Sequence, residues 1–135
     1  MLGAIQEIPK HDVMLGIGDC NAHLGRNLAR YTYHESTNTN RELVSDMVNE
    51  AGLVITNTMS RKKPGKLCTF ISDMSGSKTQ VNCIRINKKW KNSVKNCEAY
   101  SSIGSMSSDH RIVTARPKLS LRICKTYQKC YMIGM

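Results

Sequence analysis

The chain has 135 residues and a formal net charge of +10, from 20 Lys and Arg against 10 Asp and Glu. This length is that of one domain, or of part of a larger one. No stretch approaches the roughly 18 apolar residues that a membrane-spanning helix needs. Glu7, Lys10 and Asp12 interrupt the N-terminal stretch in which the apolar core of a secretory signal would lie. We therefore expect an intracellular protein, nuclear or cytoplasmic, without a membrane partner, whose positive charge favours binding to nucleic acid.

The six cysteines predict free thiols. No two of them are separated by two residues, which excludes the spacing of zinc knuckles and of thioredoxin-like motifs. Without a secretory signal, the thiols are expected to stay reduced.

The predicted elements begin with a buried strand at residues 13–19, an apolar run that ends in Asp19. Residues 40–51 form the clearest predicted helix, because a capping box precedes an apolar stripe and Gly52 suits the position after the last turn. Side chains expected to be buried on this helix are Leu43, Val44, Met47, Val48 and Ala51.

Further strands are predicted at residues 53–57, 67–71, 80–86 and 97–103, with a basic turn at residues 61–66. The alternating pattern of residues 80–86 is typical of a half-buried strand. Pro117 predicts an edge strand or a bend in residues 110–123. This order of elements indicates an α/β or α+β fold, with residues 122–135 as a frayed tail.

Three short clusters place polar groups at predicted strand ends, within a strand and on a loop. They are Gly18-Asp19-Cys20-Asn21, Val81-Asn82-Cys83-Ile84 and Ser108-Asp109-His110. A carboxylate is able to ligate Mg²⁺ or orient a water, and an amide is able to hold a phosphate oxygen or fix the tautomer of a histidine. An adjacent acid and imidazole suit acid–base chemistry. Taken singly, each cluster is more often an Asx turn or a solvent-facing polar segment.

Together, the clusters resemble the endonuclease/exonuclease/phosphatase superfamily, which carries G-D-F-N-A, I-D-Y-I and S-D-H in this order. The G-L-V-I-T-N-T segment at residues 52–58 and the C-T-F segment at residues 68–70 are similar to segments in nucleases of non-LTR retrotransposons and in proteins resembling craniofacial development protein 2. The resemblance covers about residues 5–121. It implies that residues 1–121 are the C-terminal part of such a domain, folded as an incomplete four-layered α/β sandwich.

The resemblance implies hydrolysis of a phosphodiester, in DNA rather than RNA, with Mg²⁺ or Mn²⁺ as cofactor. By this analogy, Asp19 positions or activates the attacking water and Asn21 holds the phosphate. Asp109 assists Asp19 in binding the metal, and His110 stabilises the pentacovalent phosphate or transfers a proton.

Two departures from the family pattern lower the expected activity. The family's N-terminal half, which supplies the main metal-binding Glu, has no counterpart in this chain, so a segment supplying it is an expected partner. Asn82 stands where the family has an Asp that orients the histidine, and an amide cannot stabilise imidazolium by charge. We therefore expect a truncated, retrotransposon-derived, DNA endonuclease-like phosphodiesterase that holds its metal weakly and is weakly active or inactive alone.

Two other functions stay open. One is a nucleic-acid-binding remnant without catalysis, in which cations grip phosphates around an indole. Its candidate residues are Arg61, Lys62, Lys63, Lys66, Lys88, Lys89, Trp90 and Lys91. A solvated charged face with a half-buried tryptophan explains the same residues equally well. The other function is a phosphatase for small phosphoesters, which the charge of +10 disfavours.

Overall fold

The structure is a computed structural model that describes residues 7–9, 11–26, 29–36, 41–100, 108–120 and 130–134. Its elements in chain order are β1 (Val13–Asp19), α2 (Arg41–Glu50), β2 (Leu53–Ile55), the 3-10 helix η1 (Thr56–Thr58), α3 (Pro64–Leu67), β3 (Phe70–Ile71), β4 (Lys78–Thr79), β5 (Asn82–Asn87), the 3-10 helix η2 (Lys88–Ser93), β6 (Val94–Ala99), β7 (Val113–Pro117) and β8 (Cys130–Gly134). None of the helices in these ranges is long and apolar enough to span a membrane.

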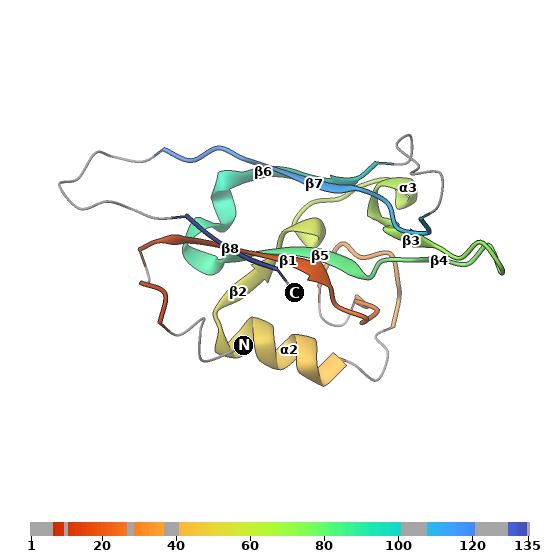
Figure 1. Cartoon of the computed structure of the whole chain (residues 1–135), viewed down its shortest axis with the longest axis horizontal. Helices are drawn as coiled ribbons and strands as arrows, with labels where there is room; N and C mark the ends of the chain where they lie inside the picture. The colour runs from red at the N-terminus through yellow and green to blue at the C-terminus, as the bar shows by residue number, and fades with distance from the viewer. Residues whose placement is uncertain are drawn as a thin grey trace.

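The elements stack as a helix layer and two sheet layers (Figure 1). A four-stranded sheet in the order β2-β5-β1-β8 lies in the middle, with α2 on one face and the β6-β7 pair on the other. All strand pairs are antiparallel except β1 with β8. The mixture of helices and antiparallel strands in open sheets confirms an α+β fold. The four-layered sandwich stays a prediction.

Strand β5 is buried on both faces, which corrects the expectation of a half-buried strand. Its buried side chains are Cys83, Ile84, Arg85 and Ile86. The alternating pattern was misleading because Arg85 occupies a polar position in the sequence, yet its side chain lies in the interior at 1% exposure. A strand covered by a helix on one side and a sheet on the other has no solvent face.

The predicted helix is confirmed as α2, and its apolar stripe packs on the sheet. Val44 is buried and Val48 is partly buried against a core that includes Leu24, Ile55 and Cys83. Ala51 is half-buried just after the helix. The predicted cap at residues 39–40 and the side chains of residues 43 and 47 lie outside the described part of the chain.

Two predicted strands are shorter than expected. The strand predicted at residues 67–71 is reduced to β3, because Pro64 opens the short helix α3 at the first-turn position that suits a proline. The strand predicted at residues 53–57 ends at Ile55. Beyond it, the hydroxyl of Thr56 donates to the Ile84 carbonyl at 2.8 Å, so a side chain replaces the backbone ladder.

The C-terminal part of the chain contains one confirmed and one wrong expectation. Pro117 is the last residue of β7, which forms a two-stranded sheet with β6 in the described part of the chain, as predicted for an edge strand. The prediction of a frayed tail is wrong for Cys130–Gly134, because these residues form β8 and pair in parallel with β1.

Candidate functional site

Asp19 and Asn82 face each other at the ends of two paired strands. They are direct partners in the antiparallel register of β1 and β5. The exposed Asp19 carboxylate accepts a hydrogen bond from the backbone N–H of Asn21 at 2.7 Å. Asn21 has a φ of 46°, a left-handed conformation that asparagine tolerates better than most residues. The Asp19 side chain therefore shapes the turn that carries Asn21 past the strand end.

His110 is placed against Asn82 by a second, shorter backbone pairing. Phe70 and His110 form an antiparallel bridge. Beside it, the N–H of Ile71 donates to the Asp109 carbonyl at 2.9 Å and the N–H of Arg111 donates to the Thr69 carbonyl at 2.8 Å. The exposed imidazole packs edge-on against Phe70, with ring centroids 5.1 Å apart. Its Nδ1 lies 3.0 Å from Asn82 Oδ1. The structure thus joins Asp19, Asn82 and His110, with Asn21 and Asp109 beside them in the chain.

Two buried residues hold the backbone of Asn82. The Thr69 hydroxyl oxygen accepts from the N–H groups of Val81 and Asn82 at 2.9 and 3.0 Å. The Asn57 amide donates to the Asn82 carbonyl at 3.2 Å and accepts from the N–H of Ile84 at 2.9 Å. Thr69 is 0% and Asn57 3% exposed. Neither residue was predicted from the sequence to support the site, although both lie in the segments that carry the family resemblance.

The amide of Asn82 selects the tautomer of the His110 ring less strictly than a carboxylate would. Its oxygen accepts a hydrogen bond from Nδ1–H, and after a flip its NH₂ donates a hydrogen bond to an unprotonated Nδ1, whereas an ionised carboxylate only accepts. With the oxygen toward Nδ1, as the structure has it, the neutral ring keeps its lone pair on Nε2. That nitrogen is then the one able to take a proton from a reacting group.

The candidate metal-binding carboxylates do not form a closed protein site. No group of three or more His, Cys, Asp or Glu side chains among the described residues is arranged to hold a metal ion. Asp73, in the turn between β3 and β4, lies against Asp109. The pKa of Asp73 is raised, first because its carboxyl hydrogen-bonds that of Asp109 and then because Asp109 is negatively charged. Asp73 was not predicted from the sequence to lie at the site.

Two thiols, of Cys20 and Cys83, follow Asp19 and Asn82 directly in the chain. The guanidinium of Arg85 donates to Cys20 Sγ. The pKa of Cys20 is lowered, first by a hydrogen bond from Cys83 and also by the charge of Arg85. The pKa of Cys83 is raised well above its usual value, first by that hydrogen bond and then by burial. The four cysteines whose side chains are described, including Cys68 and Cys97, are free, as predicted.

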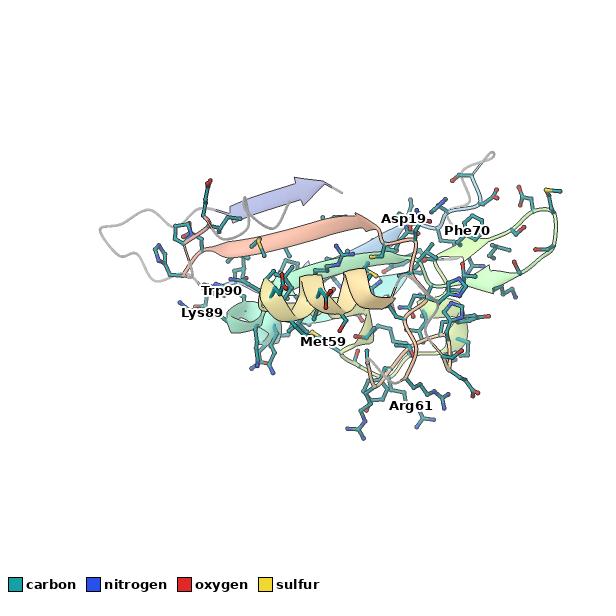
Figure 2. The ribbon with its side chains drawn as sticks, turned by 90° about the horizontal axis from the view of Figure 1, so that it is seen from below. Asp19, Met59, Arg61, Phe70, Lys89 and Trp90 are labelled. Atoms are coloured by element: carbon teal, nitrogen blue, oxygen red, sulfur yellow. The ribbon has the colours of Figure 1, made fainter. Side chains whose placement is uncertain are left out.

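The basic candidates separate into different parts of the molecule. Arg61 lies at the opposite end from Lys89 and Trp90 (Figure 2). Arg61 and Lys62 line a cavity of about 700 Å³, and Lys63 is the exposed residue before α3. Lys66, in α3, pairs with Glu98 at 3.4 Å. Lys88, Lys89, Trp90 and Lys91 all belong to η2.

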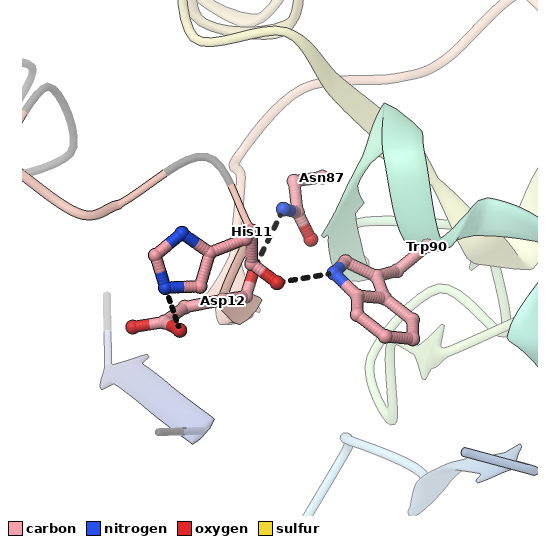
Figure 3. Close-up of polar contacts among 4 residues, drawn as sticks. All are labelled: His11, Asp12, Asn87 and Trp90. Carbon is pink, nitrogen blue, oxygen red and sulfur yellow. Dashed lines mark hydrogen bonds and ion pairs between the residues drawn. The ribbon is translucent and has the colours of Figure 1, made fainter. Parts of the chain in front are cut away.

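Trp90 takes part in packing at the start of β1. Its indole N–H donates to the His11 carbonyl at 3.2 Å (Figure 3). The side chain is half-buried, and Lys89 Nζ lies 5.9 Å from the ring centroid. This contact agrees with the expectation of a half-buried tryptophan on a charged face.

The fold and site define an α+β protein in which an acid, an amide and an imidazole meet at one end of a strand pair. No family model matches the chain. It is 28% identical over 120 residues to craniofacial development protein 2 of Bos taurus, a match that covers 85% of this chain and 20% of the relative. The protein of the same name from Tragulus javanicus is also 28% identical, with 21% of its length covered. The chain is thus distantly similar to craniofacial development protein 2 and spans about a fifth of these curated relatives.

Proposed function

We propose that this chain carries part of a phosphodiester-hydrolysing site of the endonuclease/exonuclease/phosphatase type, with little or no activity alone. One observation carries the proposal: His110 Nδ1 lies 3.0 Å from Asn82 Oδ1, and Asn82 is the strand partner of Asp19. Residues that are 91 positions apart in sequence therefore meet at one strand end. Distant similarity to craniofacial development protein 2 supports the same superfamily.

Each side chain has a role that suits its chemistry. The exposed carboxylate of Asp19 orients the attacking water, and the amide of Asn21 donates to a phosphate oxygen. His110 is held at Nδ1, so its Nε2 is the nitrogen that takes up a proton at the reacting group. Once protonated, Nε2–H donates a hydrogen bond to the phosphate and stabilises the negative charge that develops in the transition state.

The carboxylates available for Mg²⁺ are Asp19 and Asp109. Mg²⁺ is commonly held by one or two carboxylates together with substrate phosphates, and it would supply positive charge against the phosphate oxygens. Without a third ligand group among the described residues, we expect occupancy to depend on bound substrate.

Asn82 is a second reason for low activity. In a serine-protease triad, the corresponding change of Asp to Asn lowers the rate by about 10⁴ through the wrong tautomer. That figure sets a scale for the cost of an amide behind a catalytic imidazole.

The shape of the site favours a polymeric substrate over a small phosphoester. The cavity beside Asn82 has a volume of only about 140 Å³ and is lined in part by Gly18 and Arg111. Pockets that enclose small ligands measure about 300–1,000 Å³. A phosphodiester on an exposed polymer needs no such enclosure, because most of the substrate lies outside the site.

Nucleic-acid binding without catalysis is the second candidate function. The observation that favours it is the basic cavity lined by Arg61 and Lys62. It predicts salt-dependent binding of nucleic acid without turnover.

Nicking of supercoiled plasmid by residues 1–135, combined with NMR of the His110 ring, tests the proposal. We expect nicking in Mg²⁺ to stay near the level in EDTA, while a short DNA duplex with Mg²⁺ shifts the ring resonances of His110. Asp19→Asn should reduce that shift. Robust nicking that disappears in EDTA and in His110→Ala would contradict the low activity. A His110 ring that does not respond to DNA and Mg²⁺ would contradict the site.

A further inference from the structure

A second cavity, apart from the Asn82–His110 contact, is rich in positive charge. It has a volume of about 700 Å³ and lies between Arg26 with residues 30–33 on one side and the start of α3 on the other. Its lining residues are Arg26, Arg30, Tyr31, Thr32, Tyr33, Arg61, Lys62, Pro64 and Leu67. Four of these are cationic, two are tyrosines and none is acidic.

Among the described residues, the charges that converge on this cavity have little compensation from acidic side chains. Arg26 is 3.9 Å from Glu35, but both side chains are largely exposed, and such pairs contribute little. The guanidinium of Arg30 lies 5.3 Å from the centroid of the Tyr31 ring, so one cation already sits over an aromatic face. Cations brought together around a concave surface lower the energy of an anion placed among them.

Tyr33, in the wall of the cavity, is anchored to Gln80, which lies between β4 and β5. The buried side chain of Gln80 accepts from the N–H of Tyr33 at 3.0 Å, and the N–H of Gln80 donates to His34 Nε2 at 3.1 Å. His23 stacks on His34 with ring centroids 4.2 Å apart. Gln80 is 0% exposed and lies two residues before Asn82. The backbone at Tyr33 and the adjacent His34 ring are therefore held in place without a ligand.

We propose that this cavity binds a segment of single-stranded nucleic acid. The arginines and Lys62 hold its phosphates, and an unpaired base stacks on Tyr31 or Tyr33. Cationic grooves with aromatic rings are the recurring means of holding single strands, because every base has a face that stacks. The volume suits a nucleotide-sized ligand. A duplex keeps its bases paired and stacked inside, so it reaches the cations but not the rings.

The η2 surface is a weaker site for the same ligand. It has one ring, Trp90, whose N–H is bound to the His11 carbonyl, whereas two rings line the cavity. The inference deepens the proposed function, since it names the form of nucleic acid that the chain holds. It does not require hydrolysis, so binding without metal tests it separately.

Fluorescence anisotropy in EDTA would test the cavity with labelled 12-nucleotide single-stranded DNA, single-stranded RNA of the same sequence and a 12-base-pair duplex. We expect at least one single strand to bind the full chain about 10-fold more tightly than the duplex. A preference for DNA or RNA identifies the sugar, and equal binding of both supports recognition of phosphate and base alone. Duplex binding as tight as that of both single strands would overturn the inference.

Charge-removing variants test where the strand binds. Arg30→Gln combined with Arg61→Gln should weaken binding at least 10-fold and reduce the slope of log K against log salt by about 1.4, at about 0.7 per lost phosphate contact. The matched control is Arg116→Gln combined with Lys118→Gln, which removes two exposed cations in and after β7. The control should change binding less than twofold. Equal losses in the two double variants would overturn the cavity as the site.

Ring variants test the stacking. Tyr31→Leu with Tyr33→Leu should weaken single-strand binding about 10-fold and leave duplex binding unchanged, whereas Tyr31→Phe with Tyr33→Phe should retain both. Thermal melting shows whether each variant is folded. If the double leucine variant does not fold, the double phenylalanine variant still tests the inference. Loss of binding in the phenylalanine pair, or equal weakening of duplex and single strand in a folded leucine pair, would contradict stacking. Tight single-strand binding without nicking would leave the inference standing whatever the activity.

Discussion

The two ends of β5 carry the same residue type in opposite uses. At the end near the candidate site, the backbone of Asn82 is held by Thr69 and Asn57, and its amide faces His110. At the other end, the amide of Asn87 is itself the support. It accepts from the N–H of Met14 at 3.2 Å and donates to the Asp12 carbonyl at 2.9 Å.

The difference shows what makes a polar residue available for chemistry. Buried backbone groups must be satisfied, and whichever side chain satisfies them is no longer free. At Asn87 the strand uses its own residue, and Trp90 beside it adds a hydrogen bond to His11 (Figure 3). At the other end, Thr69 and Asn57, from two other segments, satisfy the backbone groups of β5. The side-chain amide of Asn82 is therefore available to hold the imidazole of His110.

Removing the Asn57 side chain, which supports β5 at Asn82, should give the largest loss of stability. Asn57→Ala removes the partner of the buried Ile84 N–H and of the partly buried Asn82 carbonyl. Each buried unsatisfied group costs about 1–3 kcal/mol, so we expect a loss of about 3 kcal/mol in the free energy of unfolding. Urea denaturation measures it. A loss below about 1 kcal/mol would show that Asn82 is held by other means.

Thr69→Val should cost less, because it removes one oxygen and keeps the side-chain shape. Two N–H groups, of Val81 and Asn82, lose their acceptor, and we expect about 2 kcal/mol. Thr79→Val is the matched control, since the buried Thr79 hydroxyl has no hydrogen-bond partner within the described residues. The control should be neutral or stabilising, and equal effects at the two positions would contradict a specific role for Thr69.

At the opposite end, Asn87→Ala should destabilise the chain by about 1 kcal/mol, because the half-buried amide is partly replaced by water. It should leave the environment of His110 unchanged. Trp90→Phe, which keeps the ring and loses one hydrogen bond, serves as the milder companion. Denaturation midpoints measure both losses of stability. A changed His110 ring spectrum in either variant would show that the two ends of β5 are coupled, which would contradict their separate roles.

The smallest expected effect concerns pH. Burial, and then the charge of His23, lowers the pKa of His34 below its ordinary value of 6.5. The unfolded chain therefore takes up a proton more readily than the folded chain, and stability falls as the pH drops below 6.5. His34→Gln keeps an acceptor for the Gln80 N–H without titrating. Denaturation midpoints at pH 7 and 5 should differ less in this variant than in the wild type. An unchanged difference would exclude His34 as a source of the pH dependence of stability.

The sequence predicted the elements that depend on local patterns. The apolar run before Asp19 and the stripe around Val44 identified β1 and α2 with little error. The motif order also named Asn82 and His110, which the fold brings into contact. The burial of Arg85 was not predictable, because its burial depends on layers contributed by segments distant in the chain.

Supports of the site were also invisible in the sequence for a physical reason. A threonine or asparagine that caps another strand's backbone has no local signature, since its partners lie 12 to 27 positions away at Thr69 and Asn57. The basic residues show the same limit. The sequence grouped these residues as one candidate surface, whereas in the structure Arg61 lines a cavity and Lys89 lies on a separate surface (Figure 2).

The most direct measurement of the central claim is the ¹⁵N spectrum of the His110 ring in the wild type, Asn82→Ala and Asn87→Ala. His110→Gln identifies its signals among the four histidines. If Asn82 Oδ1 holds Nδ1, the ring shifts and tautomer populations should change in Asn82→Ala and stay at wild-type values in Asn87→Ala. A ring that is unchanged by Asn82→Ala, or changed equally by both, would contradict the site.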